Sequence, residues 1–232
     1  MQLDMSPLII SLKTAFTATG IAFVFGLIAA YWMKGYKGKL RFLIDAVFAL
    51  PLVLPPTVVG FFLLMIFGRY GFVGKLILKF NTTIIFSWPA TVIAASVVAF
   101  PLMYRTTLGA FEQLDENIIN AARTLGVNEF KIFWKVTFPL SWPGVAAATI
   151  LSFARAIGEF GATTMVAGNI PGKTQTIPVA IYFAAEGGDM NKALFWVIII
   201  VAISMIVIIL MNYWADCQTK INFRRKSSRM LR

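Results

Sequence analysis

Histidine is absent from the 232-residue sequence, and Cys217 is its one cysteine. A disulfide within the chain is therefore excluded, and so are zinc sites built from cysteine and histidine. Catalysis by a Ser-His-Asp or a Cys-His arrangement is excluded for the same reason. We expect neither a metal site nor a cofactor.

Charged residues are also scarce. They make up 13% of the sequence, against about 25% in soluble proteins. Hydrophobic residues reach 59%, against about 45–50%. A chain of this composition must turn apolar surface toward an apolar medium, which predicts an all-α integral membrane protein. The length suits one transmembrane domain over residues 1–232, with about five spans of ~20 residues each.

Long apolar runs predict where the spans lie. Five runs cover approximately residues 7–33, 42–67, 84–104, 142–167 and 193–214. Each is long enough to cross ~30 Å of hydrocarbon as a helix. Residues 176–185 are also apolar, but this segment is too short to span and is expected to form an interfacial or re-entrant helix.

The net charge of +11 arises mainly from basic residues between and after the apolar runs. The regions after the first, third and fifth runs hold fourteen Lys and Arg, whereas the alternate regions hold five. Because cytoplasmic loops are enriched in these residues, the N-terminus is predicted outside the cell and the C-terminus in the cytoplasm. This distribution fits contact with membrane lipid better than a nucleic-acid surface, so no nucleic-acid partner is expected.

The second run contains three prolines, Pro51, Pro55 and Pro56. Proline removes a backbone hydrogen bond and clashes with the preceding turn, so a regular helix must bend or break there. One interpretation is a packing kink, and the other is a broken helix that lines a transport pathway. Both are tolerated at membrane depth, and the residues alone leave the choice open.

The predicted cytoplasmic loop, residues 111–139, reads as two short helices with a glycine corner. Ile118, Ala121, Ala122 and Leu125 recur at helical spacing and form one apolar face. Gly126 then stands where a helix C-cap is expected. Such a pair could pack on the membrane surface or on its own spans, or it could dock a cytoplasmic partner. The pattern supports both interpretations equally.

A family resemblance follows from the spacing in this loop. Asn120-Ala121-Ala122, then Gly126, then Pro139 thirteen residues later, resembles the EAA loop of ABC importer permeases. The sequence departs from that pattern at Asn120, where the family usually has Glu. The departure leaves in doubt any ion pair that the Glu would make with an ATPase.

Three further segments narrow the resemblance. Pro51–Gly60 (PLVLPPTVVG) and Phe153–Ala162 (FARAIGEFGA) are similar to the molybdate permeases and their sulfate-transporting relatives, and Asn169–Tyr182 (NIPGKTQTIPVAIY) is similar to the molybdate branch. The resemblance implies a type I ABC importer permease, multi-pass in the inner or plasma membrane. It further implies a homodimer, cytoplasmic ATP-binding subunits, an extracytoplasmic molybdate-binding protein, and alternating access driven by ATP.

The chain itself is not expected to be an enzyme. Gly172-Lys173-Thr174 looks like the end of a Walker A motif, but the glycine that this motif requires five residues earlier is Ala167. If transport is driven by ATP, another subunit must therefore hydrolyse it. A partner ATPase docking on Ala121, Ala122 and Gly126 is the role that the resemblance implies for the loop.

Arg155 and Glu159 are charged residues within the fourth apolar run, and their spacing predicts a shared helix face. Either Arg155 lies near an oxyanion path, or the two form an ion pair that fixes helix packing. The ion pair is favoured, because buried charges are usually paired. Ser152 and Thr163 could line the same path, but hydrogen bonding between helices is the commoner role.

Two other function classes compete with the importer. A membrane enzyme would need a set of titratable groups, and the spans offer little beyond Asp45, Arg155 and Glu159. A passive anion channel would have no use for a cytoplasmic helix pair. Within the importer class, sulfate and tungstate are the rival substrates, because no residue in the spans separates anions of such similar shape and charge.

Overall fold

Every regular element of the described chain is helical, which confirms the all-α prediction. The computed structural model describes residues 4–230, with side chains as far as Met211 and that of Tyr213. The elements in chain order are α1 (Ser6–Gly35), α2 (Arg41–Val53), α3 (Pro56–Phe67), α4 (Phe72–Leu78), α5 (Trp88–Glu112), α6 (Glu116–Thr124), α7 (Glu129–Ile132), the π-helical turn η1 (Phe133–Thr137), α8 (Phe138–Ile157), α9 (Gly161–Ala167), α10 (Ile177–Glu186) and α11 (Met190–Met230).

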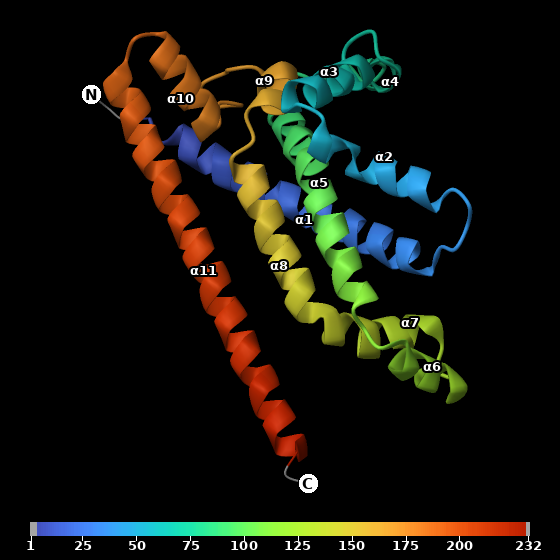
Figure 1. The fold of residues 1–232 in the computed structure, drawn as a ribbon. Coiled ribbons are helices and arrows are strands. Elements are labelled where there is room, and N and C mark those ends of the chain that lie inside the picture. Colours follow the sequence, from blue (N-terminus) through green and yellow to red (C-terminus); the bar gives the residue numbers. More distant parts are fainter. Residues whose placement is uncertain (1–3, 231–232) are drawn as a thin grey trace.

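Within the described residues, four helical stretches are long and apolar enough to cross a membrane. They are Ser6–Gly35, Trp88–Glu112, Glu129–Ile157 and Met190–Met211. A fifth span results if α2 and α3 are taken together, although the chain bends by 111° between them. In Figure 1, α3, α4 and α9 lie at the same end as the N-terminus, and α6 and α7 lie at the opposite end. The bent pair leads from the start of α2, where Arg41 pairs with Glu112 of α5 at 2.7 Å, to α3 at the end near the N-terminus.

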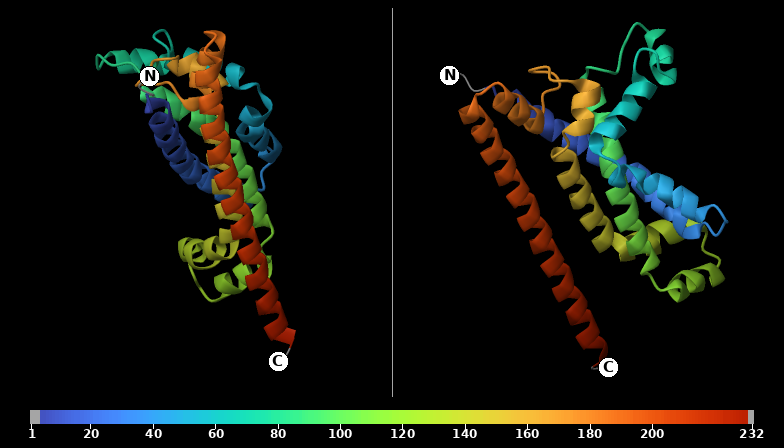
Figure 2. Two further views of the ribbon diagram at one scale, coloured as in Figure 1. Left: turned by 90° about the vertical axis from the view of Figure 1, so that its left-hand side faces the viewer. Right: turned by 45° about the horizontal axis from the view of Figure 1, so that its top comes forward.

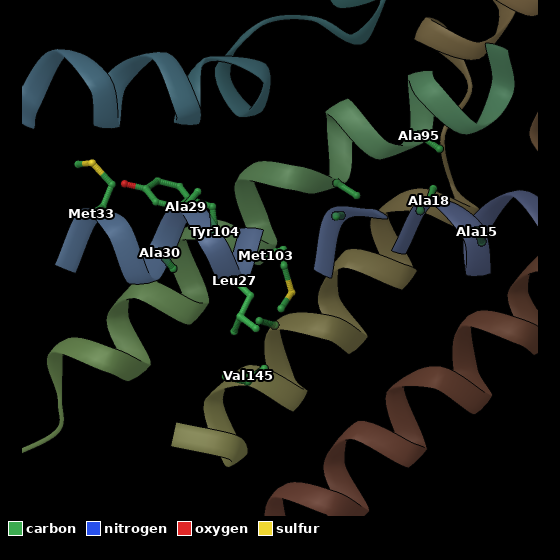
Figure 3. Packing of buried hydrophobic residues seen from close by; sticks show 14 of the residues in the cluster. Ala15, Ala18, Leu27, Ala29, Ala30, Met33, Ala95, Met103, Tyr104 and Val145 are labelled. Atoms are coloured by element: carbon green, nitrogen blue, oxygen red, sulfur yellow. The ribbon is translucent and has the colours of Figure 1, made fainter. Parts of the chain in front are cut away.

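The main core forms where α1, α5 and α8 all pack against one another. Its buried members are mostly small, including Ala18 and Ala30 of α1, Ala95 of α5 and Ala148 of α8. Figure 3 shows alanines such as Ala18, Ala30 and Ala95 among larger side chains such as Leu27, Met103 and Tyr104. Small residues allow backbones to approach, which is how helices associate where lipid removes the hydrophobic driving force.

Polar contacts join α5 to α1 and to α2. The hydroxyls of Thr14 and Thr91 are 3.0 Å apart, which ties α1 to α5. At the end near α6, the Tyr104 hydroxyl donates to Asp45 over 2.8 Å, and Arg105 pairs with the same carboxylate at 2.8 Å. Asp45 therefore holds the start of α2 against α5.

Helix α11 contacts the rest of the chain only weakly. In an apolar window of 18 residues within Met190–Met211, 6% of the residues are buried within the chain. The buried side chains Ala193 and Trp196 belong to its first turns, and Trp196 packs with Ile177 and Ala180 of α10. Figure 2 shows α11 standing apart from α1 and α5 along most of its length. Lipid or another protein must therefore cover its other faces.

The fourth span differs from the one expected over residues 142–167. The helical stretch begins at Glu129, ends at Ile157 and is followed by a break before α9. Gly158 to Phe160 leave the helix because glycine favours a helix end and because Glu159 caps the next helix from outside it. The segment expected at 176–185 forms α10, a helix of 10 residues.

Two glycines of α1 provide a matched test of the α1–α5 packing. A Cβ at Gly26 would lie 2.7 Å from Met103 Cγ and 3.2 Å from the Tyr104 amide nitrogen, whereas a Cβ at Gly20 meets nothing within 4 Å. Gly26→Leu should therefore lower the free energy of unfolding by about 1–3 kcal/mol through overpacking. Gly20→Leu should leave it nearly unchanged. Thermal unfolding in detergent measures both, and equal effects would contradict this packing.

Candidate translocation and coupling sites

The first helix break lies at the prolines between α2 and α3. Pro51 is inside α2, which ends at Val53, and Pro56 opens α3. The carbonyl of Pro55 accepts hydrogen bonds from the amides of Val58 (2.9 Å) and Val59 (3.2 Å). Helix α3 therefore restarts directly at the break, with the Pro55 carbonyl as the acceptor of its first turn.

A second break lies between α8 and α9, and one side chain spans it. Glu159 Oε1 accepts a 2.8 Å hydrogen bond from the Ala162 amide, which caps α9. Glu159 Oε2 lies 2.8 Å from Arg155 Nη1. The carboxylate is 1% exposed and the guanidinium 29%. The pair therefore joins the end of α8 to the start of α9.

The sequence predicted that Arg155 and Glu159 share one helix face, and this prediction is wrong. α8 ends at Ile157, and Glu159 lies in the extended segment between the helices. The two side chains still meet, because the chain turns directly after Gly158. The ion pair thus spans a break in the backbone, whereas the spacing predicted it along a continuous helix.

The two breaks are in contact with each other. A Cβ on Gly161 would lie 3.1 Å from Pro56 Cβ and 3.2 Å from the Thr57 amide nitrogen. A Cβ on Gly60 would lie 2.8 Å from Ala162 Cα. The first turns of α3 and α9 therefore pack backbone to backbone, and a larger residue at either glycine would force them apart.

Helices α3 and α9 share a core with the first half of α5. Its buried residues are Val59, Leu63, Ala90, Ala94, Val98, Ala162, Val166 and Ala167. This cluster is separate from the one that joins α1, α5 and α8. The described spans thus contain two larger packed bodies that share α5, beside the smaller cluster of α10 and α11.

The polar candidates Ser152 and Thr163 are inside the protein. Ser152 is 0% exposed and Thr163 1% exposed. A hollow of about 430 Å³ between α1, α2 and α5 includes Pro51 at its edge, and Ser96 is the polar residue among the described side chains that line it. Such a lining suits hydrocarbon and offers a dianion almost no hydrogen bonds.

The loop at the opposite end forms the two short helices and the glycine corner. The Asp115 carboxylate caps α6 by accepting from the Asn117 amide (2.9 Å), and Asn128 caps α7 by accepting from the Lys131 amide (2.8 Å). Between them Gly126 has φ +74°, in the left-handed region that favours glycine. This conformation turns the chain sharply from α6 into α7.

Arg123 locks the two short helices together. Its Nε lies 2.6 Å and its Nη2 3.2 Å from the two carboxylate oxygens of Glu129. Its Nη1 donates to the side-chain carbonyl of Asn120 over 3.0 Å. Asn120, which stands where the EAA pattern has Glu, therefore accepts a hydrogen bond within its own loop. Ala121 beside it is exposed, and Ala122 is half-buried.

Pro139 lies in the first turn of α8, directly after η1. A proline in a continuing helix clashes with the carbonyl four residues before it, here that of Lys135. The wider π-helical turn over Phe133–Thr137 leaves room for the ring. Helices α7, η1 and α8 therefore form one uninterrupted helical stretch, from Glu129 to Ile157.

Comparison with known proteins identifies the class. Residues 22–218 match the family model described as binding-protein-dependent transport system inner membrane component. The chain belongs to this family of membrane subunits of ABC transporters.

Three relatives show how the chain stands within that family. The molybdenum transport system permease ModB of Escherichia coli K12 is 41% identical over 210 residues, which cover 89% of this chain and 91% of the relative. ModB of Haemophilus influenzae is 47% identical over 150 residues, which cover 64% and 65%. A relative named for sulfate transport, from Chlorokybus atmophyticus, is 33% identical over 208 residues, which cover 90% and 73%.

Solved structures share the fold. The inward-facing MetNI methionine ABC transporter matches with a TM-score of 0.71 over 92% of this chain and 94% of the other, at 18% identity. This likeness confirms the predicted type I importer permease fold.

Sequence reasoning did not identify the contact between the two breaks. Gly60 follows Pro56 by four residues and Gly161 follows Glu159 by two, and each is unremarkable in its own segment. Only the fold brings the two glycines together. In the sequence, this contact is indicated by nothing more than a small residue shortly after each break.

The Arg155–Glu159 pair can be tested by a double-mutant cycle. Glu159→Gln leaves the Arg155 charge without a partner at membrane depth, and it should lower the free energy of unfolding by about 1–3 kcal/mol. The double variant Arg155→Gln/Glu159→Gln should recover part of this loss, because no charge is left unpaired. Thermal unfolding in detergent measures both. A fully stable Glu159→Gln variant would contradict the structural role of the pair.

Proposed function

We propose that this chain is the membrane subunit of an ATP-driven importer for molybdate. The observation that carries the proposal is its 41% identity to ModB of Escherichia coli, with about nine-tenths of each chain covered. The relative named for sulfate transport is more distant, at 33%. Molybdate is therefore the first substrate to test, with tungstate and sulfate as its rivals.

A homodimer is part of the proposal. A dianion cannot cross hydrocarbon without a protein path, because each intramembrane charge costs several kcal/mol. The hollow beside α2 is apolar, and Ser152 and Thr163 are buried inside one chain. The outer faces of α11 are uncovered. A path between two copies meets both requirements, since it encloses the anion and covers exposed helix faces.

The orientation that we propose has the N-terminus outside and α6 and α7 in the cytoplasm. The distribution of Lys and Arg supports it. An ATP-binding subunit would then dock on α6, where Ile118 and Leu125 are apolar and 47% and 82% exposed. A molybdate-binding protein would deliver the anion at the opposite end, beside α3 and α9. The membrane would be the inner or plasma membrane.

Alternating access follows from the two packed bodies. ATP binding would move α6 and α7, and the continuous stretch to Ile157 would carry this motion to the break at Gly158. There α9 and α3 would move together, because their first turns pack backbone to backbone. Arg155 and Glu159 would keep the two sides of the break joined during the movement.

Reconstitution tests the substrate. The chain is co-expressed with candidate ATP-binding subunits and reconstituted with a molybdate-binding protein, and uptake of labelled molybdate is measured. Uptake should depend on ATP, and tungstate should compete more effectively than sulfate. Nucleotide-independent flux would favour an anion channel, and stronger competition by sulfate would make the chain a sulfate permease.

The docking role is tested at Gly126. Gly126→Leu places a bulky side chain in a left-handed turn beside α6, and it should reduce ATP-dependent uptake at least tenfold by displacing the docking helix. Gly188→Leu is the matched control, because Gly188 also has a positive φ (+79°) and open space around it but lies at the other end, after α10. Equal loss of uptake in both variants, at equal membrane levels, would contradict docking through α6.

A further inference from the structure

A large groove runs between α1 and the loop helices. Its volume is about 1150 Å³, and it is lined by residues 23–37 on one side and by α6, α7 and η1 on the other. On the α1 side, Val24, Ile28 and Trp32 are 51%, 60% and 48% exposed. This wall of the groove therefore offers an apolar surface on which a hydrocarbon chain can lie.

The lining changes in character along the groove. Toward the middle of α1 it is apolar, with Phe23, Leu27 and Ile28, and near the end of the helix it becomes basic, with Lys34 and Lys37. From Phe23 to Trp32 the helix rises about 14 Å, and the hydrocarbon of one leaflet is about 15 Å thick. The apolar part is thus as long as one acyl chain, with cations at its end.

The charges at this end have a net positive sign. Lys34, Lys37 and Arg123 line the groove together with Glu116 and Glu129, and Glu129 is already bonded to Arg123. The Lys34 ammonium is buried and has no hydrogen-bond partner among the described residues. An unpaired buried ammonium is costly and favours a nearby anion. A flexible four-carbon stem lets the lysine reach one.

Aromatic residues mark the same level. Trp32 and Tyr36 of α1 face the groove, and Trp134 of η1 faces it from the other side. Trp and Tyr favour the headgroup region of a bilayer. A basic pocket between helices at that depth is suited to a lipid phosphate.

We propose that this groove binds a phospholipid with an anionic headgroup, its acyl chain along Phe23–Trp32 and its phosphate beside Lys34 and Lys37. The inference rests on the membrane placement proposed above and goes beyond transport. Glu116, Ile119 and Asn120 of α6 form the facing wall. A bound headgroup therefore contacts the docking helix and fixes it against α1, which makes the coupling of ATP hydrolysis to transport dependent on anionic lipid.

Lipid binding is measured directly, without a transport assay. The full chain is purified in mild detergent in the assembly in which it is isolated, and native mass spectrometry follows added phosphatidylglycerol or phosphatidylcholine with the same acyl chains. We expect at least fivefold more bound phosphatidylglycerol than phosphatidylcholine. Lys37→Gln should abolish this preference. Lys39→Gln should preserve it, because Lys39 is exposed in the same loop and does not line the groove.

A second pair of variants tests the acyl part. Ile28→Trp fills the groove and should reduce bound phosphatidylglycerol at least fivefold, whereas Ile9→Trp changes an equally exposed residue of α1 outside the groove and should not. Binding that is equal for both lipids, or unaffected by Lys37→Gln and Ile28→Trp, overturns the proposal. Competition by inorganic phosphate with no effect of Ile28→Trp would assign the site to a free anion and also overturn it.

A photo-crosslinker at position 28 separates a lipid from a protein occupant. In the isolated assembly it should label phospholipid. Labelling of a second copy of the chain or of an ATP-binding subunit would overturn the lipid assignment. Because neither readout requires uptake, failure of the lipid site can be distinguished from failure of the proposed transport function.

Discussion

Satisfaction of the backbone at two helix breaks is the constraint on which the rest of the structure depends. Lipid offers no hydrogen bonds, so every freed amide and carbonyl needs a partner within the protein. At the first break the Pro55 carbonyl accepts from the amides of Val58 and Val59, and at the second the Glu159 carboxylate accepts from the Ala162 amide. A carboxylate at that depth in turn requires a cation, which Arg155 supplies.

This constraint explains why the charged pair is an unpromising anion site. The Arg155 guanidinium is occupied by the carboxylate that caps α9, and releasing it to an oxyanion would leave Glu159 uncompensated and 1% exposed. A transport path also requires weak, exchangeable contacts. The pair is therefore better suited to holding a hinge than to binding cargo.

Local chemistry allowed much of this arrangement to be predicted, and long-range packing did not. Prolines allowed the break after Val53 to be predicted, and the small residues around Gly126 allowed the loop to be predicted. Each of these signals acts on its own segment. The break at Gly158 has no proline, so helical spacing placed Arg155 and Glu159 on one face and failed. The contact between Gly60 and Ala162 joins segments about a hundred residues apart, and no local propensity encodes it.

The continuous helix between the loop and the second break links the two ends of the molecule. From Phe138 to Ile157 α8 has 20 residues, with Pro143 inside the helix, and it is about 30 Å long. The helical stretch begins still earlier, at Glu129, because η1 makes room for Pro139 without interrupting it. A displacement of α7 is therefore passed along a helical stretch that first ends at Gly158. The flexible point lies beside the contact of α9 with α3, so the geometry concentrates movement where the two packed bodies meet.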